Sequence, residues 1–307
     1  MTGQPAIHTV TGPVRPEEIG FTLPAEHLYI SSSSPDSWQL NDEDVFAAEL
    51  KAFTDLGGSC LVDLTPLSMG RNPAGLAALS RRSGVAIVMS TGWYTDASLP
   101  PQDRLDRRST GDIAEQLIAD ITGGDQETGI RPGIIGEFGP VGSWLTPMDE
   151  RLHRAYARAQ LATGVPLSAH AWRSEVGLLQ LDLLEEEGVD PRRVAIGHCD
   201  SWPVLSYWQR IAQRGAYVQL DNLSLQPPKV TELLVRLVRE MVELGYAGQL
   251  LFSHDLAQAE ELRYLGGHGL TYVSERFLPA LAAAGVPAPV LRAITTDNPR
   301  ALLTVPA

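Results

Sequence analysis

The sequence contains few lysines, few cysteines and no long apolar run. Only two of its 24 basic residues are lysines, Lys51 and Lys229, so lysine is excluded from most positions at which chemistry could occur. Cys60 and Cys199 lie far apart within apolar runs, which predicts buried free thiols in a reducing compartment. No apolar run approaches the roughly 18 residues of a membrane span, and no basic-then-apolar leader is visible. We therefore expect a cytoplasmic protein.

Positive charge is scarce as well. The formal net charge is −13, whereas nucleic acids and anionic membranes both require a basic face on their partner. The composition therefore excludes these two partners and favours a small-molecule substrate. A length of 307 residues, with 44% hydrophobic and 20% charged residues, suits a soluble globular protein with a full core.

Short apolar runs alternate with helical segments along the chain. Strands are expected at 26–30, 59–65, 85–90, 133–138, 166–170, 193–199, 216–221 and 249–255. A small hairpin is expected at 7–13, and a last helix at 274–284 is followed by a tail. Eight strand–helix units in about 250 residues predict an α/β protein made of one (β/α)₈ TIM barrel over 1–307. The competing open doubly wound sheet would be expected to carry a phosphate-binding glycine-rich turn after its first strand, and none is present.

Histidines and carboxylates stand at or near the carboxyl ends of five predicted strands. They are His27, Glu137, His170, His198 and Asp255. These strand ends face one mouth of a barrel, where active sites form. Three imidazoles and two carboxylates can bind one or two divalent metals, which would activate a water molecule and polarise a carbonyl or phosphoryl oxygen. Each residue alone is more often structural than functional, so the prediction depends on all five together.

Aromatic residues and one arginine are expected around the same mouth. The candidate substrate-binding residues are Trp93, Tyr94, Trp172, Arg173 and Trp202. Arginine recognises carboxylate or phosphate well, and aromatic rings favour a partly apolar substrate. The alternative is that Trp172 only packs its loop.

Four further polar residues lie near the predicted strand ends. Asp221 and Asn222 are additional mouth candidates. Strand alternation indicates that His254 points to the opposite face from Asp255, so we interpret it as structural. Asp63 is expected to brace the barrel.

Several motifs follow one another in a specific order. They include Gly-Glu-Phe-Gly at 136–139, Ile-Gly-His-Cys-Asp at 196–200, Ser-His-Asp at 253–255 and Asp-Asn-Pro-Arg at 297–300. In this order, the sequence resembles the phosphotriesterase-related family of the amidohydrolase superfamily over nearly its whole length. The resemblance implies a hydrolase of esters, lactones, amides or phosphoesters that uses metal-activated water. It also implies one or two divalent ions, zinc in the first place and manganese as the alternative, and it is compatible with a homodimer.

The resemblance also implies a role for each strand-end residue. His170 and His198 match the ligands of the more exposed metal, and Glu137 matches the ligand that bridges the two metals. Some family members have a carboxylated lysine at that bridging position. His27 and Asp255 match ligands of the more buried metal, and Asp255 is implied to be the catalytic residue that accepts the proton of the attacking hydroxide.

The sequence departs from the family pattern at Ala25. The family's first strand carries His-x-His, and Ala25 stands where the first histidine is expected. Alanine cannot bind a metal, so a water or Glu26 could fill the position, or the buried site could be empty. The departure could also mark non-hydrolytic chemistry, such as a decarboxylation, elimination or rearrangement, or a silent ligand-binding barrel. Because metal ligands pre-organise one another, we expect an asymmetric or single-metal site.

Overall fold

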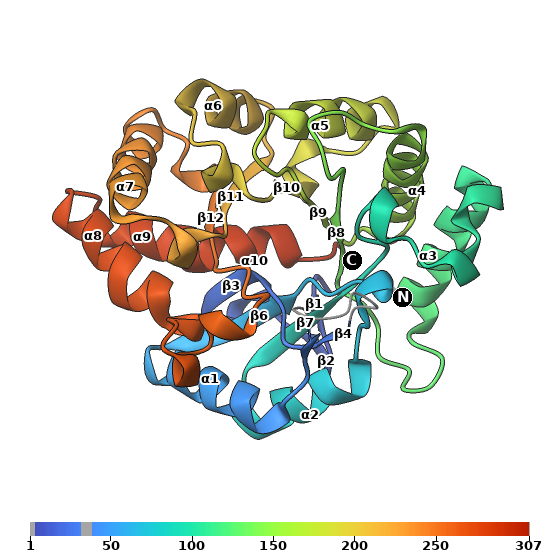
Figure 1. The fold of residues 1–307 in the computed structure, drawn as a ribbon, viewed down its shortest axis with the longest axis horizontal. Helices are drawn as coiled ribbons and strands as arrows, with labels where there is room; N and C mark the ends of the chain where they lie inside the picture. Colours follow the sequence, from blue (N-terminus) through green and yellow to red (C-terminus); the bar gives the residue numbers. More distant parts are fainter. Residues whose placement is uncertain (1–3, 32–38, 307) are drawn as a thin grey trace.

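The computed structural model describes residues 4–31 and 39–306. Eight parallel strands form one sheet that curves into a barrel, and the helices surround it (Figure 1). In hydrogen-bonded order, the strands are β3 (Phe21–Glu26), β6 (Gly58–Asp63), β7 (Ala86–Thr91), β8 (Ile134–Phe138), β9 (Leu167–Ala169), β10 (Val194–Ile196), β11 (Tyr217–Leu220) and β12 (Leu250–Phe252). Just beyond β12, the Asp255 N–H donates to the Ala25 carbonyl over 3.0 Å, which links the last strand back to the first. The predicted (β/α)₈ barrel is confirmed.

The first four helices begin at residues whose side chains cap the helix. They are α1 (Glu43–Asp55), α2 (Pro73–Ser83), α3 (Thr110–Gly123), α4 (Pro147–Thr163), α5 (Val176–Glu186), α6 (Leu205–Gln213), α7 (Pro228–Glu243), α8 (Leu278–Ala283), α9 (Ala288–Arg292) and α10 (Asn298–Leu303). Ser109 and Thr146 form capping boxes at the starts of α3 and α4. Gly84 and Gly164, both with positive φ, end α2 and α4.

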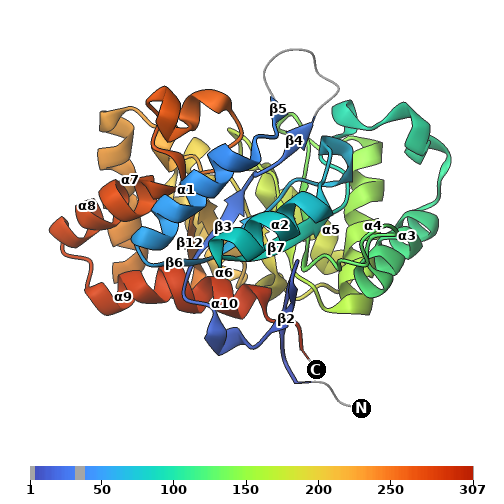
Figure 2. The same cartoon turned by 90° about the horizontal axis from the view of Figure 1, so that it is seen from below.

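Two small antiparallel pairs lie at opposite ends of the barrel (Figure 2). The predicted hairpin is confirmed as β1 (Ile7–Thr9) and β2 (Gly12–Val14), and it lies at the end that holds both termini. Ala6 and Val305 pair there through two backbone hydrogen bonds of 3.2 and 2.8 Å. The pair β4 (Ile30–Ser31) and β5 (Gln39–Leu40) lies at the other end, which is the mouth.

The first barrel strand differs from its predicted bounds. It runs over Phe21–Glu26 instead of 26–30, so His27 directly follows the strand. The register of β3 against β6 shifts between Leu23 and Glu26, around Pro24. Proline removes a backbone donor and is tolerated within a sheet at such an irregularity. The proline obscured the strand in the sequence pattern.

The predicted last helix at 274–284 is confirmed as a π-helical turn over Val273–Phe277 followed by α8. The tail after it is also helical, and a π-helical turn over Ala293–Asp297 joins α9 to α10. Pro289 and Pro299 stand in the first turns of α9 and α10. The Asn298 side chain anchors the tail by donating to the carbonyls of Ala247 and Leu250, each over 2.8 Å.

The core has an outer layer between strands and helices and a separate cluster that includes residues of β3, β6, β7 and β8. That cluster contains Ile7, Ile19, Ala25, Cys60, Val62, Leu64, Val88, Ile134 and Leu303. Cys60 and Cys199 are buried free thiols, as predicted. Within residues 4–31 and 39–306, every helix is too short or too polar to cross a membrane.

His153 makes the stability of the barrel depend on pH. This buried side chain packs edge-on against Phe138, with ring centroids 5.0 Å apart, and its Nδ1 lies 2.6 Å from the Asp149 carbonyl. Burial lowers the pKa of His153 from 6.5 to about 4. The unfolded chain therefore binds more protons below pH 6.5, so stability is lost as the pH falls from 6.5 towards 4.

We expect wild-type protein to lose about 2 kcal/mol more stability between pH 7 and pH 5 than His153→Gln. Urea unfolding of both proteins at the two pH values measures this difference, and the other titrating groups cancel in the comparison. Equal losses in the two proteins would contradict a depressed His153 pKa.

Candidate metal centre

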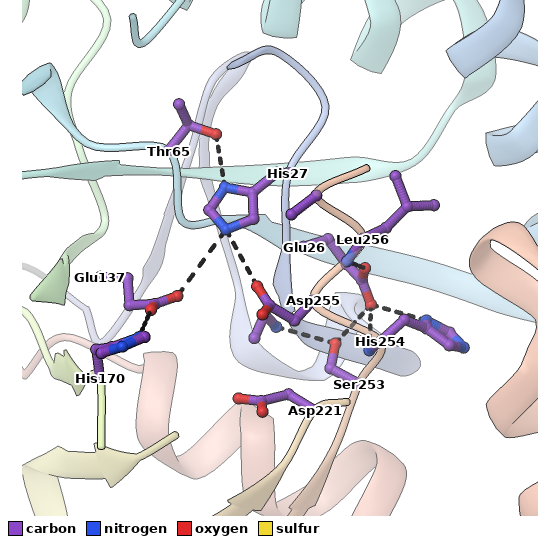
Figure 3. Close-up of polar contacts among 12 residues, drawn as sticks. Glu26, His27, Thr65, Glu137, His170, Asp221, Ser253, His254, Asp255 and Leu256 are labelled. Carbon is purple, nitrogen blue, oxygen red and sulfur yellow. Dashed lines mark hydrogen bonds and ion pairs between the residues drawn. The ribbon is translucent and has the colours of Figure 1, made fainter. Parts of the chain in front are cut away.

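The structure brings together all five residues predicted from the strand ends. The ligand atoms of Glu137, His170 and His198 all lie within 4.8 Å of one another, and so do those of His27, Glu137 and Asp255. Figure 3 shows His27, Glu137, His170 and Asp255 pointing toward one another from different strands. Glu137 belongs to both groups.

The two carboxylate oxygens of Glu137 face different groups. Oε1 lies 3.0 Å from His198 Nε2 and contacts His170 Nδ1, while Oε2 lies 3.9 Å from His27 Nε2. The Nδ1 of His170 and the Nε2 of His198 are themselves 2.7 Å apart. A carboxylate with one oxygen on each side is suited to bridge two cations.

Asp221 orients the His198 ring. Its Oδ1 accepts the backbone N–H of His198 over 2.9 Å and lies 2.8 Å from His198 Nδ1. Gln219 donates to the other Asp221 oxygen over 2.8 Å. With Nδ1 used in this way, His198 presents Nε2 to Glu137, an arrangement common among metal-binding histidines. Asp221 therefore acts on the site through His198.

Thr65 and Asp63 hold His27 and its loop. The Thr65 hydroxyl lies 2.8 Å from His27 Nδ1, so Nε2 faces Glu137 and Asp255. Asp63 accepts the backbone N–H groups of Leu28 and Thr65 over 2.7 and 3.0 Å, which is the bracing role predicted for it. The sequence reasoning missed Thr65, although the residue ends the predicted second strand.

The buried ionisable groups stabilise one another's charges. Burial would lower the pKa of His27, but its hydrogen bond to Asp255 and the charges of Asp255 and Glu137 raise that pKa to about 9. Burial would raise the pKa of Glu137, but the positive charges of His198 and His170 hold it well below its usual range. A divalent cation among these oxygens and ring nitrogens would supply the same positive charge. The donor set therefore fits a metal.

Four of the five predicted substrate-binding residues lie near the mouth or are exposed. The Tyr94 hydroxyl lies 3.3 Å from His170 Nδ1, and the Trp172 ring lies edge-on to His198 at 5.4 Å. The exposed Arg173 places its guanidinium 5.0 Å from the Trp172 ring centroid. Trp202 is 38% exposed.

Trp93 lies in the hydrophobic core instead. Its side chain is fully buried, and its indole N–H donates to Asp103 over 2.7 Å. The prediction grouped it with Tyr94 because the two residues are adjacent. Adjacent residues in an extended segment point in opposite directions, however, and only Tyr94 approaches the predicted ligands.

Ala25 and Glu26 directly precede the predicted ligand His27. Ala25 is buried in the cluster with Cys60 and Val62, and its methyl group offers no donor to a metal. Glu26 is fully buried and accepts hydrogen bonds from Ser253, His254 and Leu256 (Figure 3). Its carboxylate is therefore bound to the segment after β12 and does not face the predicted ligands, which removes one of the alternatives considered for Ala25.

Comparison with known proteins gives matches over nearly the whole chain. The model of the Phosphotriesterase family matches residues 5–303. The phosphotriesterase homology protein of Mycobacterium tuberculosis is 32% identical over 321 residues, covering 96% of this chain and 97% of that protein. The N-acetyltaurine hydrolase of Homo sapiens is 29% identical over 351 residues, covering 97% of each. The crystal structure of the phosphotriesterase homology protein from Escherichia coli, complexed with phosphate in its active site, superposes with a TM-score of 0.89 at 29% identity, covering 93% of this chain and 99% of that one.

We expect Asp221→Asn to weaken binding of a divalent ion by Glu137, His170 and His198 about 10- to 100-fold, because His198 loses its orienting carboxylate. Competition with a chromophoric chelator measures the dissociation constant. Asp149→Asn is the matched control, since Asp149 is an equally buried carboxylate that caps α4 away from the site. Equal affinities in the two variants would contradict an orienting role for Asp221.

Proposed function

The chain belongs to the phosphotriesterase family of the amidohydrolase superfamily, and from this premise we propose that it is a divalent-metal-dependent hydrolase. The bond that it would hydrolyse is that of an amide, ester, lactone or phosphoester. The observation that carries the proposal is the pair of donor groups that share Glu137, with one carboxylate oxygen facing each group.

The two groups differ in how well they can hold an ion. Glu137, His170 and His198 provide a carboxylate and two imidazoles, a set that suits zinc, with manganese as the alternative. His27, Glu137 and Asp255 provide a single imidazole, because position 25 is an alanine. We therefore assign a tighter first ion to the His170–His198 group and a weaker second ion to the His27–Asp255 group.

Asp255 is placed to accept a proton at the mouth. Its side chain keeps 16% exposure, its Oδ1 lies 3.2 Å from His27 Nε2, and Asn222 donates to its Oδ2 over 3.4 Å. Burial and the charge of Glu137 raise the pKa of Asp255 above its usual range, the direction that makes a carboxylate a better proton acceptor. A divalent ion bound beside it would lower the pKa of a bound water and polarise the scissile group.

Arg173 favours a substrate with an anionic end. Its guanidinium is exposed beside the Trp172 ring, and that ring in turn contacts the predicted ligand His198. Guanidinium groups bind carboxylate, sulfonate and phosphate oxygens in pairs. The human relative is named as a hydrolase of N-acetyltaurine, a compound that carries a sulfonate. The Escherichia coli relative holds phosphate in its active site. We therefore propose an anionic acyl compound as the substrate class.

We expect protein purified without chelators to bind two divalent ions with unequal affinity. Elemental analysis and zinc titration measure the two equivalents, and Ala25→His should tighten the second ion, because it adds an imidazole. Failure of wild-type protein to bind zinc or manganese would overturn the metal assignment. Tighter metal binding together with lost native activity in Ala25→His would show that Ala25 is an adaptation.

Hydrolysis is tested with N-acyl amino sulfonates, N-acyl amino acids, lactones, aryl esters and phosphoesters, each with added zinc or manganese. We expect the protein to hydrolyse an anionic acyl compound. Both Asp255→Asn and chelation of the metal should abolish this activity. Arg173→Met should raise KM for that compound about tenfold or more, with a small change in kcat, because a ground-state contact is lost. A neutral ester is the matched control for Arg173→Met. Equal KM changes for both substrates would contradict the assigned anion contact.

A further inference from the structure

Glu26 lies at the end of β3 with its carboxylate fully buried. An ionised carboxylate in such a place requires hydrogen-bond donors. Oε1 accepts the Ser253 hydroxyl over 2.7 Å, together with the backbone N–H and the ring Nδ1–H of His254, each over 2.8 Å. Oε2 accepts the Leu256 N–H over 3.1 Å. All four donors come from the segment that follows β12.

These donors lie on both sides of Asp255. Ser253 and His254 precede it, and Leu256 follows it, as Figure 3 shows. The Asp255 N–H itself donates to the Ala25 carbonyl over 3.0 Å, and the Ala25 N–H donates to Ser253 Oγ over 3.0 Å. Every residue from 253 to 256 is thus tied to Ala25 or Glu26. We call this set of contacts the Glu26 clamp.

The clamp holds Asp255 in a strained backbone conformation. Asp255 has φ of 53°, in the left-handed region that non-glycine residues rarely occupy. Such a conformation persists only when the surrounding contacts over-determine it. The hydrogen bonds of Ser253, His254 and Leu256 to one carboxylate provide that restraint. The carboxylate belongs to the residue directly before His27.

The ring of His254 is part of the clamp and has a defined tautomer. Its Nε2 accepts the Val273 N–H over 3.0 Å, so its proton is on Nδ1, which donates to Glu26. Glu26, Ser253 and His254 therefore resemble a Ser–His–acid set in composition only. All three side chains are buried, and the serine hydroxyl is bonded to the carboxylate instead of the imidazole. The cluster braces the backbone and contains no available nucleophile.

We propose that Glu26 is a positioning residue that sets Asp255 against His27 and so assembles the weaker metal site. His27 Nε2 and Asp255 Oδ1 lie 3.2 Å apart, although their residues belong to opposite ends of the barrel sequence. The clamp fixes the backbone of both residues through one side chain. It thereby supplies pre-organisation to a site that has alanine at position 25. This inference rests on the proposed function, because it concerns the second ion.

The test compares Glu26→Gln with Glu49→Gln by cobalt titration followed by absorption spectroscopy. If the amide oxygen of the Glu26→Gln variant keeps the three donors of Oε1, the new NH₂ group faces the Leu256 N–H. Both groups are donors, so the hydrogen bond to Leu256 is lost. Glu49 is a matched control, because it is a buried glutamate that accepts the backbone N–H groups of Arg263 and Leu270 over 2.8 and 3.4 Å, outside the clamp. Thermal melting of both variants controls for general loss of stability.

We expect Glu26→Gln to weaken the second cobalt ion about 10- to 100-fold while the first ion stays within about twofold of wild type. Glu49→Gln should leave both dissociation constants unchanged, even if its melting temperature falls as far as that of Glu26→Gln. Ser253→Ala, which removes one donor, should weaken only the second ion, by several-fold. This variant also carries the test if Glu26→Gln does not fold.

Three results would count against the clamp, and they are distinguishable. If Glu26→Gln and Ser253→Ala bind the second ion as tightly as wild type does, the positioning role is overturned and the proposed hydrolase is left intact. Equal weakening of the first and second ions would show a general structural role for Glu26. A wild-type protein without any second ion would instead remove the weaker site from the proposed function, and the clamp's role with it.

Discussion

The joining of β12 to β3 is the contact on which one of the two donor groups depends. His27 and Asp255 follow the first and last strands of the sheet, so they meet beside Glu137 only because the sheet closes. In a barrel, this closure brings residue 27 beside residue 255, whereas an open sheet would hold them at opposite edges. The hydrogen bond from Asp255 to Ala25 and the contacts of Glu26 make that closure specific at the mouth.

Burial of so many ionisable groups requires that each charge have a partner. Moving a lone charge out of water costs several kcal/mol, so unpaired carboxylates here would be neutral or the fold would be less stable. The site avoids this cost by alternating carboxylates and imidazoles, with Asp221 behind His198 and Asp63 behind the His27 loop. Because the outer carboxylates accept backbone N–H groups, the inner ones remain directed at the centre.

Much of the fold and of the candidate site could be predicted from the sequence, because both depend on periodic features. Apolar runs alternating with helices predicted the barrel, and the strand ends predicted the residues that the structure brings together. The direction of side chains near an irregularity could not be predicted. Leu23 packs in the outer core, and strict alternation would place Ala25 with it. The register shift around Pro24 instead places Ala25 in the other cluster, and a one-residue shift inverts every later side chain.

The two donor groups depend on different parts of the fold. Glu137, His170 and His198 follow or lie on the neighbouring strands β8, β9 and β10, and Asp221 follows the next strand, so their placement is set by direct ladder pairing. His27 and Asp255 depend on closure between the first and last strands, and the Glu26 carboxylate contributes four hydrogen bonds to it. A substitution at the end of β3 would therefore act on the His27–Asp255 group and leave the supports of the other group in place. The proposed weaker site could thus vary while the first donor group keeps its geometry.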